Sequence, residues 1–403
     1  MGPLLIAGAG IGGLSAAVAL AQRGFRVHIH ERAPQIREVG AGLQLGPNGF
    51  RAFERLGIAQ AMQQIAFQPG AVVLLDSLSG TEICHQELGE SFLKRFGHPY
   101  QVGFRADVQR VLLEAARMYP DLIEIHLSDG ICSFVESAES IVATLDSGAC
   151  VSGSALIGAD GLWSQTRQSI IGDGRPRVSG HIAYRAVLPV PDVPTDILTD
   201  DVQVWVGPKH HLVCYKLRGG SLFNIVAIFQ SARYLEGWDS EADGAELRIG
   251  FADACPRVQR LLGHIQTWRM WVLCDRDPAH GWSVGRATLL GDAAHPMLPY
   301  LAQGACMAIE DAVCVANKLA GCHWDVATAL RAYEDARFER TASVQTVARE
   351  MGELNHATGA VRETRNRALA ARDPKNHDAN AWLFETDGPR APDRALSFFG
   401  TVR

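Results

Sequence analysis

The chain has 403 residues, of which 47% are hydrophobic and 20% are charged, so it is long enough for two or three domains with large buried cores. Its 38 basic and 44 acidic side chains give a net charge of −6 and form no basic run, which leaves no extended surface for nucleic acid or an anionic membrane. The nine cysteines are odd in number and form no C-x-x-C pair, which argues against a disulfide scaffold and a zinc ribbon.

The first thirty residues carry the pattern of a strand, a helix and a second strand. Residues 4–7 form a short apolar run that predicts a buried strand, and the small and apolar residues 14–23 predict a helix. Gly24 stands where a helix commonly ends in the left-handed conformation, and the alternation over residues 27–30 predicts a strand. Together these elements predict the opening βαβ unit of an α/β sheet.

The loop between the first strand and the helix has the glycine spacing of a dinucleotide-binding turn. In this G-x-G-x-x-G motif, Gly8 makes a tight turn, Gly10 lets a pyrophosphate approach the backbone, and Gly13 lets helix and strand pack closely. The free N–H groups at the start of the helix would then bind phosphate. Glu31 ends the second strand, where a carboxylate can accept ribose hydroxyls, and Arg32 beside it is a further candidate contact. The motif predicts a dinucleotide but does not distinguish NAD from FAD.

The middle of the chain has mostly strand patterns. Residues 71–88 predict a hairpin with strands at 72–76 and 82–88, and residues 105–118 predict a helix capped by Asp107. Further strands are expected at 181–190, 202–206, 212–217, 222–230 and 268–274.

The C-terminal third returns to helical patterns. Alanine-rich helices are expected between residues 304 and 351. After residue 372 the chain is polar and punctuated by proline, which predicts an irregular tail lying across the surface.

Two later segments point to the cofactor. Residues 156–161 form an apolar strand that ends in Asp-Gly, and residues 288–296 form a second apolar strand followed by Gly-Asp-Ala-Ala-His-Pro. Together with the glycine motif, they resemble the three sequence marks of the single-component FAD-dependent aromatic hydroxylases, the group A flavoprotein monooxygenases. The stretches from Glu38 to Asn48 and from Gly285 to Asn317 match this family densely. The resemblance covers nearly the whole chain and is strongest to 3-hydroxybenzoate 6-hydroxylases, with salicylate 1-monooxygenases and 6-hydroxynicotinate 3-monooxygenases as near relatives.

The resemblance implies a particular division of the α/β fold. A Rossmann-like FAD-binding domain of the glutathione-reductase type would carry an inserted β-sheet substrate domain and a C-terminal helical region. The FAD-binding domain would comprise residues 1–70, 99–178 and 276–355, the substrate domain 71–98 and 179–275, and the C-terminal helix and tail 356–403.

The resemblance also assigns cofactor contacts outside the glycine motif. The carboxylate of Asp292 would hold the ribityl chain of FAD, and Arg105 would contact its diphosphate. The backbone N–H groups of Gly304 and Ala305 would face the pyrimidine edge of the flavin and stabilise negative charge on the reduced ring. Asp160 is assigned a cofactor role, either toward FAD or toward the pyridine nucleotide.

The implied reaction uses three small molecules besides the protein. FAD would occupy the single glycine motif permanently and without a covalent bond, while NADH or NADPH would bind transiently as co-substrate. O₂ would supply the oxygen atom that is added to a hydroxylated aromatic acid. Neither nucleic acid nor membrane is expected as a partner, and no metal site is expected. A homodimer is the default assembly, and the cytoplasm is the expected compartment because no signal peptide is recognisable.

The catalytic base is expected on the predicted strand near residue 212. Because side chains alternate along a strand, His211, Val213 and Tyr215 would share one face. The resemblance makes His211 the base that accepts the phenolic proton, a task suited to a neutral imidazole. Tyr215 would either bind the substrate carboxylate or pack with its hydroxyl satisfied, and Gln44 is a further active-site candidate.

One position departs from the 3-hydroxybenzoate 6-hydroxylase pattern. Where those enzymes carry Gln beside a tyrosine, this chain has Pro299 beside Tyr300, and both residues are candidate substrate contacts. A proline cannot hydrogen-bond a phenol, so the partner that orients His211 must be missing or supplied elsewhere. Met-x-Pro at 297–299 is similar to the decarboxylating salicylate and 6-hydroxynicotinate enzymes, whereas Gln44 and the turn Leu217-Arg218-Gly219-Gly220 are similar to the 3-hydroxybenzoate type. The pattern therefore leaves two reactions open, 6-hydroxylation of 3-hydroxybenzoate to gentisate and decarboxylating hydroxylation.

Two functions from other classes also fit the fold. A flavoprotein dehydrogenase or reductase would use the same cofactor without inserting oxygen, and a flavin carrier would catalyse nothing. Uptake of O₂ with formation of a hydroxylated product would separate the first hypothesis from both.

Overall fold

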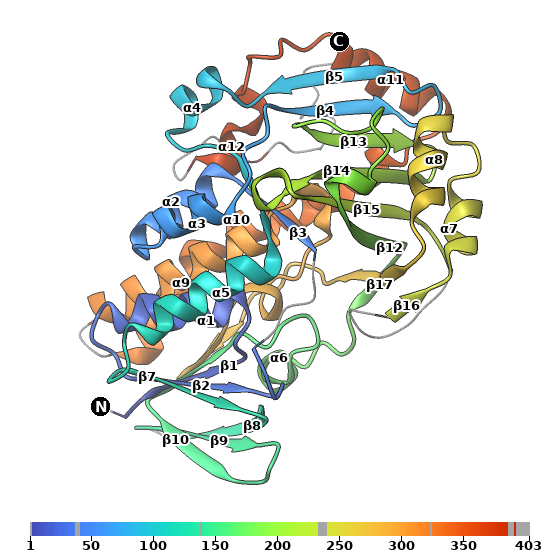
Figure 1. The fold of residues 1–403 in the computed structure, drawn as a ribbon. Coiled ribbons are helices and arrows are strands. Elements are labelled where there is room, and N and C mark those ends of the chain that lie inside the picture. Colours follow the sequence, from blue (N-terminus) through green and yellow to red (C-terminus); the bar gives the residue numbers. More distant parts are fainter. Residues whose placement is uncertain are drawn as a thin grey trace.

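The computed structural model describes residues 2–36, 41–137, 139–232, 240–322, 325–385 and 391, and within these ranges the chain forms two large sheets joined by long helices. The lower sheet in Figure 1 contains the N-terminal strand, and the upper sheet contains most of the middle of the chain. The expected α/β architecture with an inserted β-rich part is confirmed.

The lower sheet has six strands and is parallel except at one edge, where β18 is antiparallel to β19. In spatial order its strands are β18 (Ser283–Val284), β19 (Ala287–Leu289), β11 (Ala155–Gly158), β1 (Leu4–Ala7), β2 (Val27–Glu31) and β7 (Ile123–Leu127).

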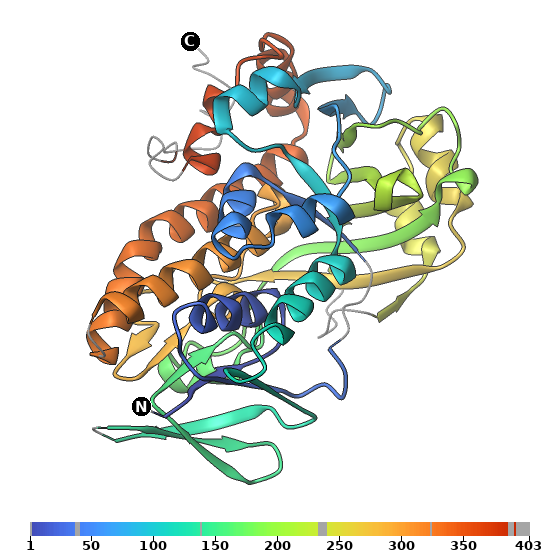
Figure 2. The same ribbon diagram turned by 60° about the vertical axis from the view of Figure 1, so that its left-hand side comes forward.

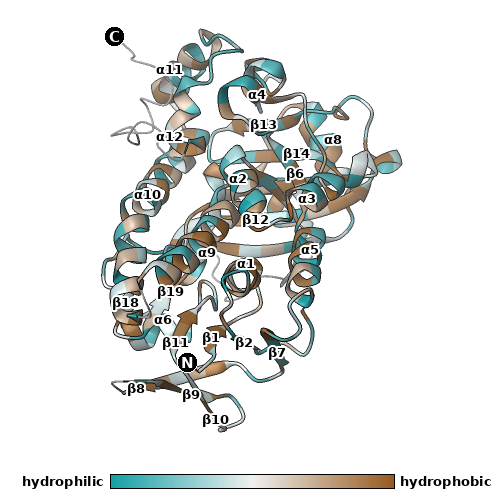
Figure 3. Cartoon of the chain, turned by 90° about the vertical axis from the view of Figure 1, so that its left-hand side faces the viewer, coloured by the Kyte–Doolittle hydropathy of each residue, from teal (hydrophilic) through white to brown (hydrophobic). Residues whose placement is uncertain are grey.

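Both faces of the six-stranded sheet are covered, as the unbroken apolar run of β1 requires. Leu4 and Ile6 face the helices α1 (Ile11–Ala21), α5 (Arg105–Arg117) and α9 (Gly304–Gly321). Leu5 and Ala7 face a small sheet on the other side, drawn at the bottom of Figures 1 and 2. Its strands are β8 (Ile131–Glu136), β9 (Ile141–Leu145) and β10 (Cys150–Gly153). Figure 3 shows the hydrophobic colouring of β1 and α1.

The upper sheet has eight strands and contains all five strands expected from the middle of the chain. The expected hairpin is also present, and its first strand pairs with the edge of this sheet in parallel. In spatial order the strands are β16 (Ser240–Ala242), β17 (Trp268–Asp275), β12 (Arg177–Pro189), β15 (Leu222–Gln230), β14 (His210–Leu217), β13 (Val202–Gly207), β4 (Ala71–Asp76) and β5 (Glu82–Glu87).

The two faces of the eight-stranded sheet have different partners. Helices α7 (Gly244–Gly250) and α8 (Pro256–His264) cover the outer face, on the right of Figure 1. The inner face is turned toward α9 and toward α10 (Val326–Asn355), which runs beside α9. A site between the two sheets is therefore built from both halves of the fold.

Shorter elements complete the described chain. The strands are β3 (Gly42–Leu45) and β6 (Gln101–Phe104), and the helices are α2 (Pro47–Arg55), α3 (Ala59–Ile65), α4 (Glu90–Phe96), α6 (Gln165–Ile170), α11 (Gly359–Ala370) and α12 (Ala381–Phe384). The 3₁₀ turns are η1 (Val190–Asp192), η2 (Arg218–Gly220), η3 (Gly291–Ala293), η4 (Pro299–Leu301) and η5 (Asp378–Asn380). No helix in the described ranges is both long enough and apolar enough to cross a bilayer.

Two expectations about local structure were wrong. Helix α5 starts at Arg105 and is preceded by Phe104, so Asp107 is in its first turn and binds the guanidinium of Arg218 instead of capping the helix. The segment after residue 372 does not only lie across the surface, because Trp382 and Phe384 of α12 are buried in a core with α4. Most of the tail beyond residue 385 falls outside the described residues.

Candidate active site

The glycine loop at the end of β1 leaves an open space at one position. A Cβ atom at Gly8, whose φ is +97°, would lie 2.7 Å from the carbonyl oxygen of Ala159. A Cβ at Gly13 would lie 2.0 Å from the carbonyl oxygen of Gly8. A Cβ at Gly10 would meet no atom within 4 Å, although Gly10 immediately precedes α1. Packing of the protein thus requires two of the glycines, while the third borders a free space at a helix N-terminus, where phosphate binds favourably.

Glu31 lies directly beside this loop. One oxygen of its carboxylate accepts a hydrogen bond from the backbone N–H of Ala9 at 2.7 Å, and the other accepts one from Ala33 at 2.9 Å. Gln109 of α5 donates to the carbonyl of Ala9 at 3.2 Å and so supports the loop from the opposite side. Arg32 is exposed at the end of β2. The ribose contact of Glu31 and any contact of Arg32 stay predictions.

The third sequence mark forms a second wall of the site. Asp292 is half-buried in η3, and a Cβ placed on Gly304 would lie 3.7 Å from its Oδ1 atom. The Asp292 carboxylate therefore faces the first turn of α9, which begins with Gly304 and Ala305. These three predicted residues are brought together, and their contacts to the cofactor stay predictions.

A buried ionic network fixes η3 to α9 and α10. The Asp311 carboxylate binds Nε2 of His295 at 2.6 Å, Nε of Arg337 at 2.6 Å and the N–H of Gly291 at 3.1 Å. Burial opposes ionisation of Asp311, but the interactions with His295 and Arg337 outweigh it and lower its pKa to about 2. The sequence did not identify Asp311 and Arg337, because Arg337 lies 26 residues further along the chain and carries no motif.

Arg167 holds the same turn from the side of β11. Its buried guanidinium donates to the carbonyls of Ala293 at 2.9 Å and Ala294 at 2.6 Å, and it also binds the carboxylate of Asp173. A shift of η3 would break these bonds, so Arg167 positions the turn that carries Asp292.

Two predicted cofactor residues have structural partners. Asp160 accepts hydrogen bonds from Oγ of Ser164 at 2.5 Å and from the N–H and hydroxyl of Thr166 at 3.1 Å, which stabilises the start of α6. Arg105 is half-buried at the first turn of α5, and its N–H binds the carbonyl of Ala41. A direct contact of either side chain with a cofactor stays a prediction.

The expected alternation along β14 is present. Leu212 and Cys214 pack in the outer core with α7 and α8, and His210 contacts the ring of Phe251 there. Tyr215 packs in the inner core, and the ring of His211 lies 5.4 Å from that of Tyr300, between centroids. The two predicted active-site side chains of β14 thus share the inner face.

Tyr215 is part of a cluster that includes Gln44. Oε1 of Gln44 accepts the hydroxyl of Tyr100 at 2.5 Å, and Gln44 also hydrogen-bonds Tyr215. Burial raises the pKa of the Tyr215 hydroxyl, and the bond to Gln44 opposes this only in part, so the tyrosine is a neutral hydrogen-bonding group.

Asn224 is an active-site candidate that the sequence did not single out. It is opposite Tyr215 on β15 and fully buried, and its Oδ1 accepts the N–H of Gly42 at 2.8 Å. Its Nδ2 has no partner among the described residues. A buried donor without a partner costs free energy unless a ligand binds it, and the only hint in the sequence was one polar residue within the apolar run LFNIVAIFQ.

His211 is oriented by another histidine. Its Nδ1 atom lies 2.7 Å from Nε2 of His356, which follows α10, and no described residue hydrogen-bonds its Nε2. Burial, together with nearby His181 and His210, lowers the pKa of His211 to about 3, so its imidazole is neutral at neutral pH. His356 therefore occupies the orienting role that Pro299 cannot fill. The sequence did not identify it, because 145 residues separate it from His211.

Pro299 and Tyr300 form η4 near this histidine. Pro299 is exposed, and the hydroxyl of Tyr300 lies 2.6 Å from Nδ1 of His181. The Tyr300 ring packs so closely on α10 that a Cβ on Gly352 would lie 2.4 Å from it. Direct contacts of these two residues with substrate stay predictions.

Comparison with known proteins places this arrangement in a family. Residues 2–349, most of the chain, match the FAD binding domain family. The chain belongs to this family. The chain is 42% identical over 372 residues to 3-hydroxybenzoate 6-hydroxylase 1 of Aquipseudomonas alcaligenes, with 92% of this chain and 94% of the relative covered.

Two further proteins are less similar to this chain. The 6-hydroxynicotinate 3-monooxygenase of Pseudomonas fluorescens is 33% identical over 358 residues, with 86% of this chain and 90% of that protein covered. The crystal structure of Klebsiella pneumoniae HpxO complexed with FAD and uric acid has a TM-score of 0.80 at 27% identity, covering 92% of this chain and 93% of that one. The chain is thus an FAD-dependent aromatic-ring monooxygenase by family, and the resemblance inferred from its motifs is confirmed.

The observed site fits FAD, the cofactor of this family. The backbone of Gly10 is open to a close approach at the N-terminus of α1, as binding of a pyrophosphate there requires. The Asp292 carboxylate faces the start of α9, and the contacts of both with the rest of the cofactor stay predictions.

Proposed function

We propose that this enzyme hydroxylates 3-hydroxybenzoate at C6 to give gentisate, consuming O₂ and NADH or NADPH. The observation that carries the proposal is His211, a neutral imidazole on the inner sheet face that is fixed through Nδ1 and keeps Nε2 for a ligand. The similarity to 3-hydroxybenzoate 6-hydroxylase 1, at 42% identity over 92% of this chain, supports the choice of substrate.

The chemistry of the ring explains why a base is required. When bound, FAD takes a hydride from the pyridine nucleotide and activates O₂ so that one oxygen atom can be transferred. The ring must be rich in electrons at the carbon that is attacked. Removal of the phenolic proton by Nε2 of His211 delivers electron density to C6, the carbon para to the hydroxyl. General-base catalysis of this kind contributes about 10²–10⁴-fold.

We further propose that Tyr215 and Asn224 bind the substrate carboxylate. Both are buried on the inner face, directly opposite one another on neighbouring strands. Nδ2 of Asn224 is a donor without a described partner, and a carboxylate accepts such a bond strongly. Asn224→Leu should therefore raise the KM for 3-hydroxybenzoate while FAD content stays constant.

The decarboxylating alternative is not favoured. The similarity to the 6-hydroxynicotinate enzyme is 33%, against 42% for the 3-hydroxybenzoate enzyme. A panel of 3-hydroxybenzoate, salicylate and 6-hydroxynicotinate separates the reactions when NADH oxidation, product mass and CO₂ release are all measured. We expect gentisate without CO₂ from the first acid, whereas catechol and CO₂ from salicylate as the fastest reaction would reverse the assignment.

The role of His211 has its own test. His211→Ala should retain FAD and pyridine-nucleotide binding but lower gentisate formation by about 10²–10⁴-fold. NADH oxidation should fall less, and the surplus reduced oxygen should appear as hydrogen peroxide. If His211→Ala keeps a normal rate and normal coupling, the base lies elsewhere, and water held near Gln44 becomes the better candidate.

Compartment and assembly follow from the proposed chemistry and the family. We propose the cytoplasm, where reduced pyridine nucleotide is available, and the described cysteines form no disulfide. The homodimer is likewise proposed, and light scattering on the purified enzyme measures it directly.

A further inference from the structure

Three histidines and a tyrosine form one continuous hydrogen-bonded chain behind the proposed base. Nδ1 of His211 lies 2.7 Å from Nε2 of His356, and Nδ1 of His356 lies 3.3 Å from Nε2 of His181. Nδ1 of His181 lies 2.6 Å from the hydroxyl of Tyr300. Both ring nitrogens of His356 and of His181 are thus engaged, and only Nε2 of His211 remains for a ligand.

Parts of the fold far apart in sequence hold this chain together. His211 is on β14, His181 is on β12, and His356 caps the C-terminal end of α10. The carbonyl of His356 accepts the N–H of Lys209 at 3.0 Å, which ties the end of α10 to the start of β14. The rings are therefore positioned by backbone contacts and not only by one another.

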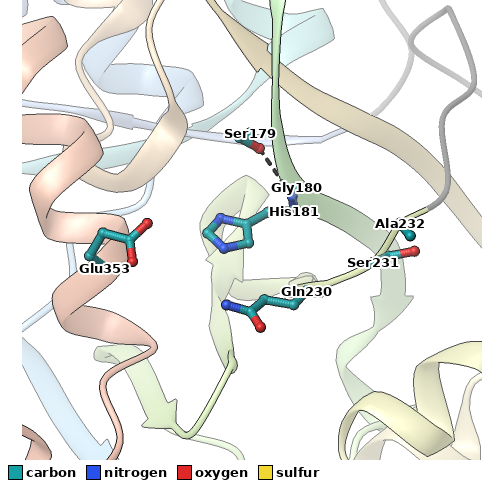
Figure 4. A pocket seen from close by; sticks show the side chains of 7 residues that line it. All are labelled: Ser179, Gly180, His181, Gln230, Ser231, Ala232 and Glu353. Carbon is teal, nitrogen blue, oxygen red and sulfur yellow. Dashed lines mark hydrogen bonds between the residues drawn. The ribbon is translucent and has the colours of Figure 1, made fainter.

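The hydrogen-bonded series of side chains reaches an open pocket at His181. An open pocket of about 430 Å³ is lined by Ser179, His181, Gln230 and the exposed Glu353 of α10, among others. Figure 4 shows the imidazole of His181 extending into the space beside Glu353. The inner end, at His211, lies on the buried face of the sheet.

We propose that His356, His181 and Tyr300 form a relay that carries the phenolic proton from His211 to solvent at this pocket. The inference rests on the proposed function, because it needs a phenol as the proton donor. The relay also provides the hydrogen-bond partner that is missing at Pro299, because His356 orients the imidazole of His211. Nε2 of that imidazole must accept the phenolic proton.

Each step of the relay breaks one bond to hydrogen and forms another, and no electrons are transferred. The phenol loses its proton to Nε2 of His211, and Nδ1 of His211 passes its proton to Nε2 of His356. His356 passes the proton on its Nδ1 to His181, and His181 passes its own to the Tyr300 oxygen. The hydroxyl of Tyr300, which is half-buried and lies beside His181, then gives its proton to water, so one proton enters and one leaves.

Burial and neighbouring charges disfavour a protonated, positively charged histidine within the relay. Burial lowers the pKa of His211, His356 and His181, and the rings lower one another's affinity for a second proton. Arg365 adds to this effect at His356, whereas Glu353 opposes it at His181. Glu353 and Asp275 are the charges that act on Tyr300, whose pKa is raised mainly by burial. A negative charge at the outer end and depressed basicity inside both favour outward transfer.

The test measures gentisate formation by the FAD-loaded enzyme with saturating NADH, O₂ and 3-hydroxybenzoate. His356→Gln can keep a hydrogen bond to His211 but cannot relay a proton, so its turnover should fall at least tenfold with unchanged FAD content and KM. The turnover of the His181→Ala variant should fall by a similar factor. Because His181 lines the open pocket, added imidazole should enter and restore turnover, more strongly as the pH rises and imidazole becomes neutral.

His210→Gln is the matched control, since His210 is the adjacent buried histidine on the opposite face of β14 and binds Ser77. It should keep the wild-type turnover. Normal turnover in His356→Gln, or a slow His181→Ala that imidazole does not restore, would overturn the relay. If His356→Gln does not fold, the imidazole response of His181→Ala decides alone. Failure of the proposed function is a different result, because wild-type enzyme would then form no gentisate.

Discussion

At Gly10, the absence of a side chain is expected to serve cofactor binding and not protein packing. Apart from its chain neighbours, no described residue has an atom within 4 Å of a Cβ built there, so Gly10→Val should fold, with a loss of only about 1 kcal/mol at the start of the helix. The branched side chain would fill the space beside the N-terminus of α1. We expect a purified protein without flavin absorbance that FAD does not reconstitute.

Gly263→Val is the control for Gly10→Val. A Cβ at Gly263 also meets no atom within 4 Å, but Gly263 is in α8, far from the glycine loop. This variant should stay yellow. Stoichiometric FAD in Gly10→Val would show that the cofactor does not approach the backbone there.

Asp292 is the second residue whose main expected partner is the cofactor. Its carboxylate faces the start of α9, and hydrogen bonds to charged groups contribute about 1.5–3 kcal/mol. Asp292→Ala should therefore raise the FAD dissociation constant by about 10–100-fold while the melting temperature of the apoprotein changes little.

Asp325→Ala is the control for Asp292→Ala, because it should change protein stability and not FAD affinity. Asp325 caps α10 through Thr328 and contacts no site residue, so its loss should lower stability without affecting FAD affinity. If Asp292→Ala lowers the stability of the apoprotein as Asp325→Ala does and keeps FAD, Asp292 serves the turn and not the cofactor.

At the scale of elements, the packing of η3, α9 and α10 depends on one buried carboxylate. Asp311→Ala would leave Arg337 with Glu310 as its remaining ionic partner, and it would leave the imidazole of His295 without a hydrogen-bond partner among the described side chains. Removing one partner of a buried ion pair costs about 3 kcal/mol or more. Denaturant unfolding of the apoprotein should show this loss.

The double variant Asp311→Leu, Arg337→Leu tests the reason for the loss. Replacing a buried pair by apolar side chains is often close to neutral, so it should recover part of the stability. A double variant no more stable than Asp311→Ala would mean that packing, and not an unpaired charge, causes the effect.

The elements differ in how well the sequence predicted them. The first strand, helix and strand were predicted because alternation, glycine spacing and apolar runs are local. Asp107 was misassigned as a cap because a carboxylate in the first turn has the same local signature, and only the fold brings Arg218 to it. The burial of α12 depends on α4, almost 300 residues earlier, and has no local signal.

The candidate site was predicted only where a residue carries a motif. His211, Tyr215 and Gln44 were found through the resemblance, and the structure brings Tyr215 and Gln44 into hydrogen-bonding contact. His356 and Asn224 were missed because their roles arise from pairing across strands and from the end of α10. Contacts between residues far apart in the sequence produce no local periodic pattern from which they could be predicted.

For the whole molecule, buried neutral histidines make stability sensitive to acid. The pKa of His211 is lowered to about 3 by burial, while its pKa in the unfolded chain is about 6.5. The unfolded state therefore binds more protons below about pH 6.5, and stability falls as the pH drops from there toward the folded pKa. His356, with a pKa also lowered by burial, acts in the same direction.

Thermal unfolding of the FAD-loaded enzyme at pH 7.5 and at pH 5 measures this effect. His211 alone should cost up to about 1.4 kcal/mol for each pH unit below about 6.5. Asp311 and Glu310 do not mask it, because their pKa values are lowered to about 2 and they stay ionised in this range. Equal melting temperatures at the two pH values would contradict the neutral state of the buried histidines.

In the proposed function, the FAD site of one sheet and the histidine face of the other cooperate in inserting oxygen. A turnover experiment with 3-hydroxybenzoate, NADH and ¹⁸O₂, followed by mass spectrometry of the product, tests this cooperation. We expect gentisate that carries one heavy oxygen atom and its full carboxylate. A product without the label, or NADH oxidation with no product at all, would contradict it.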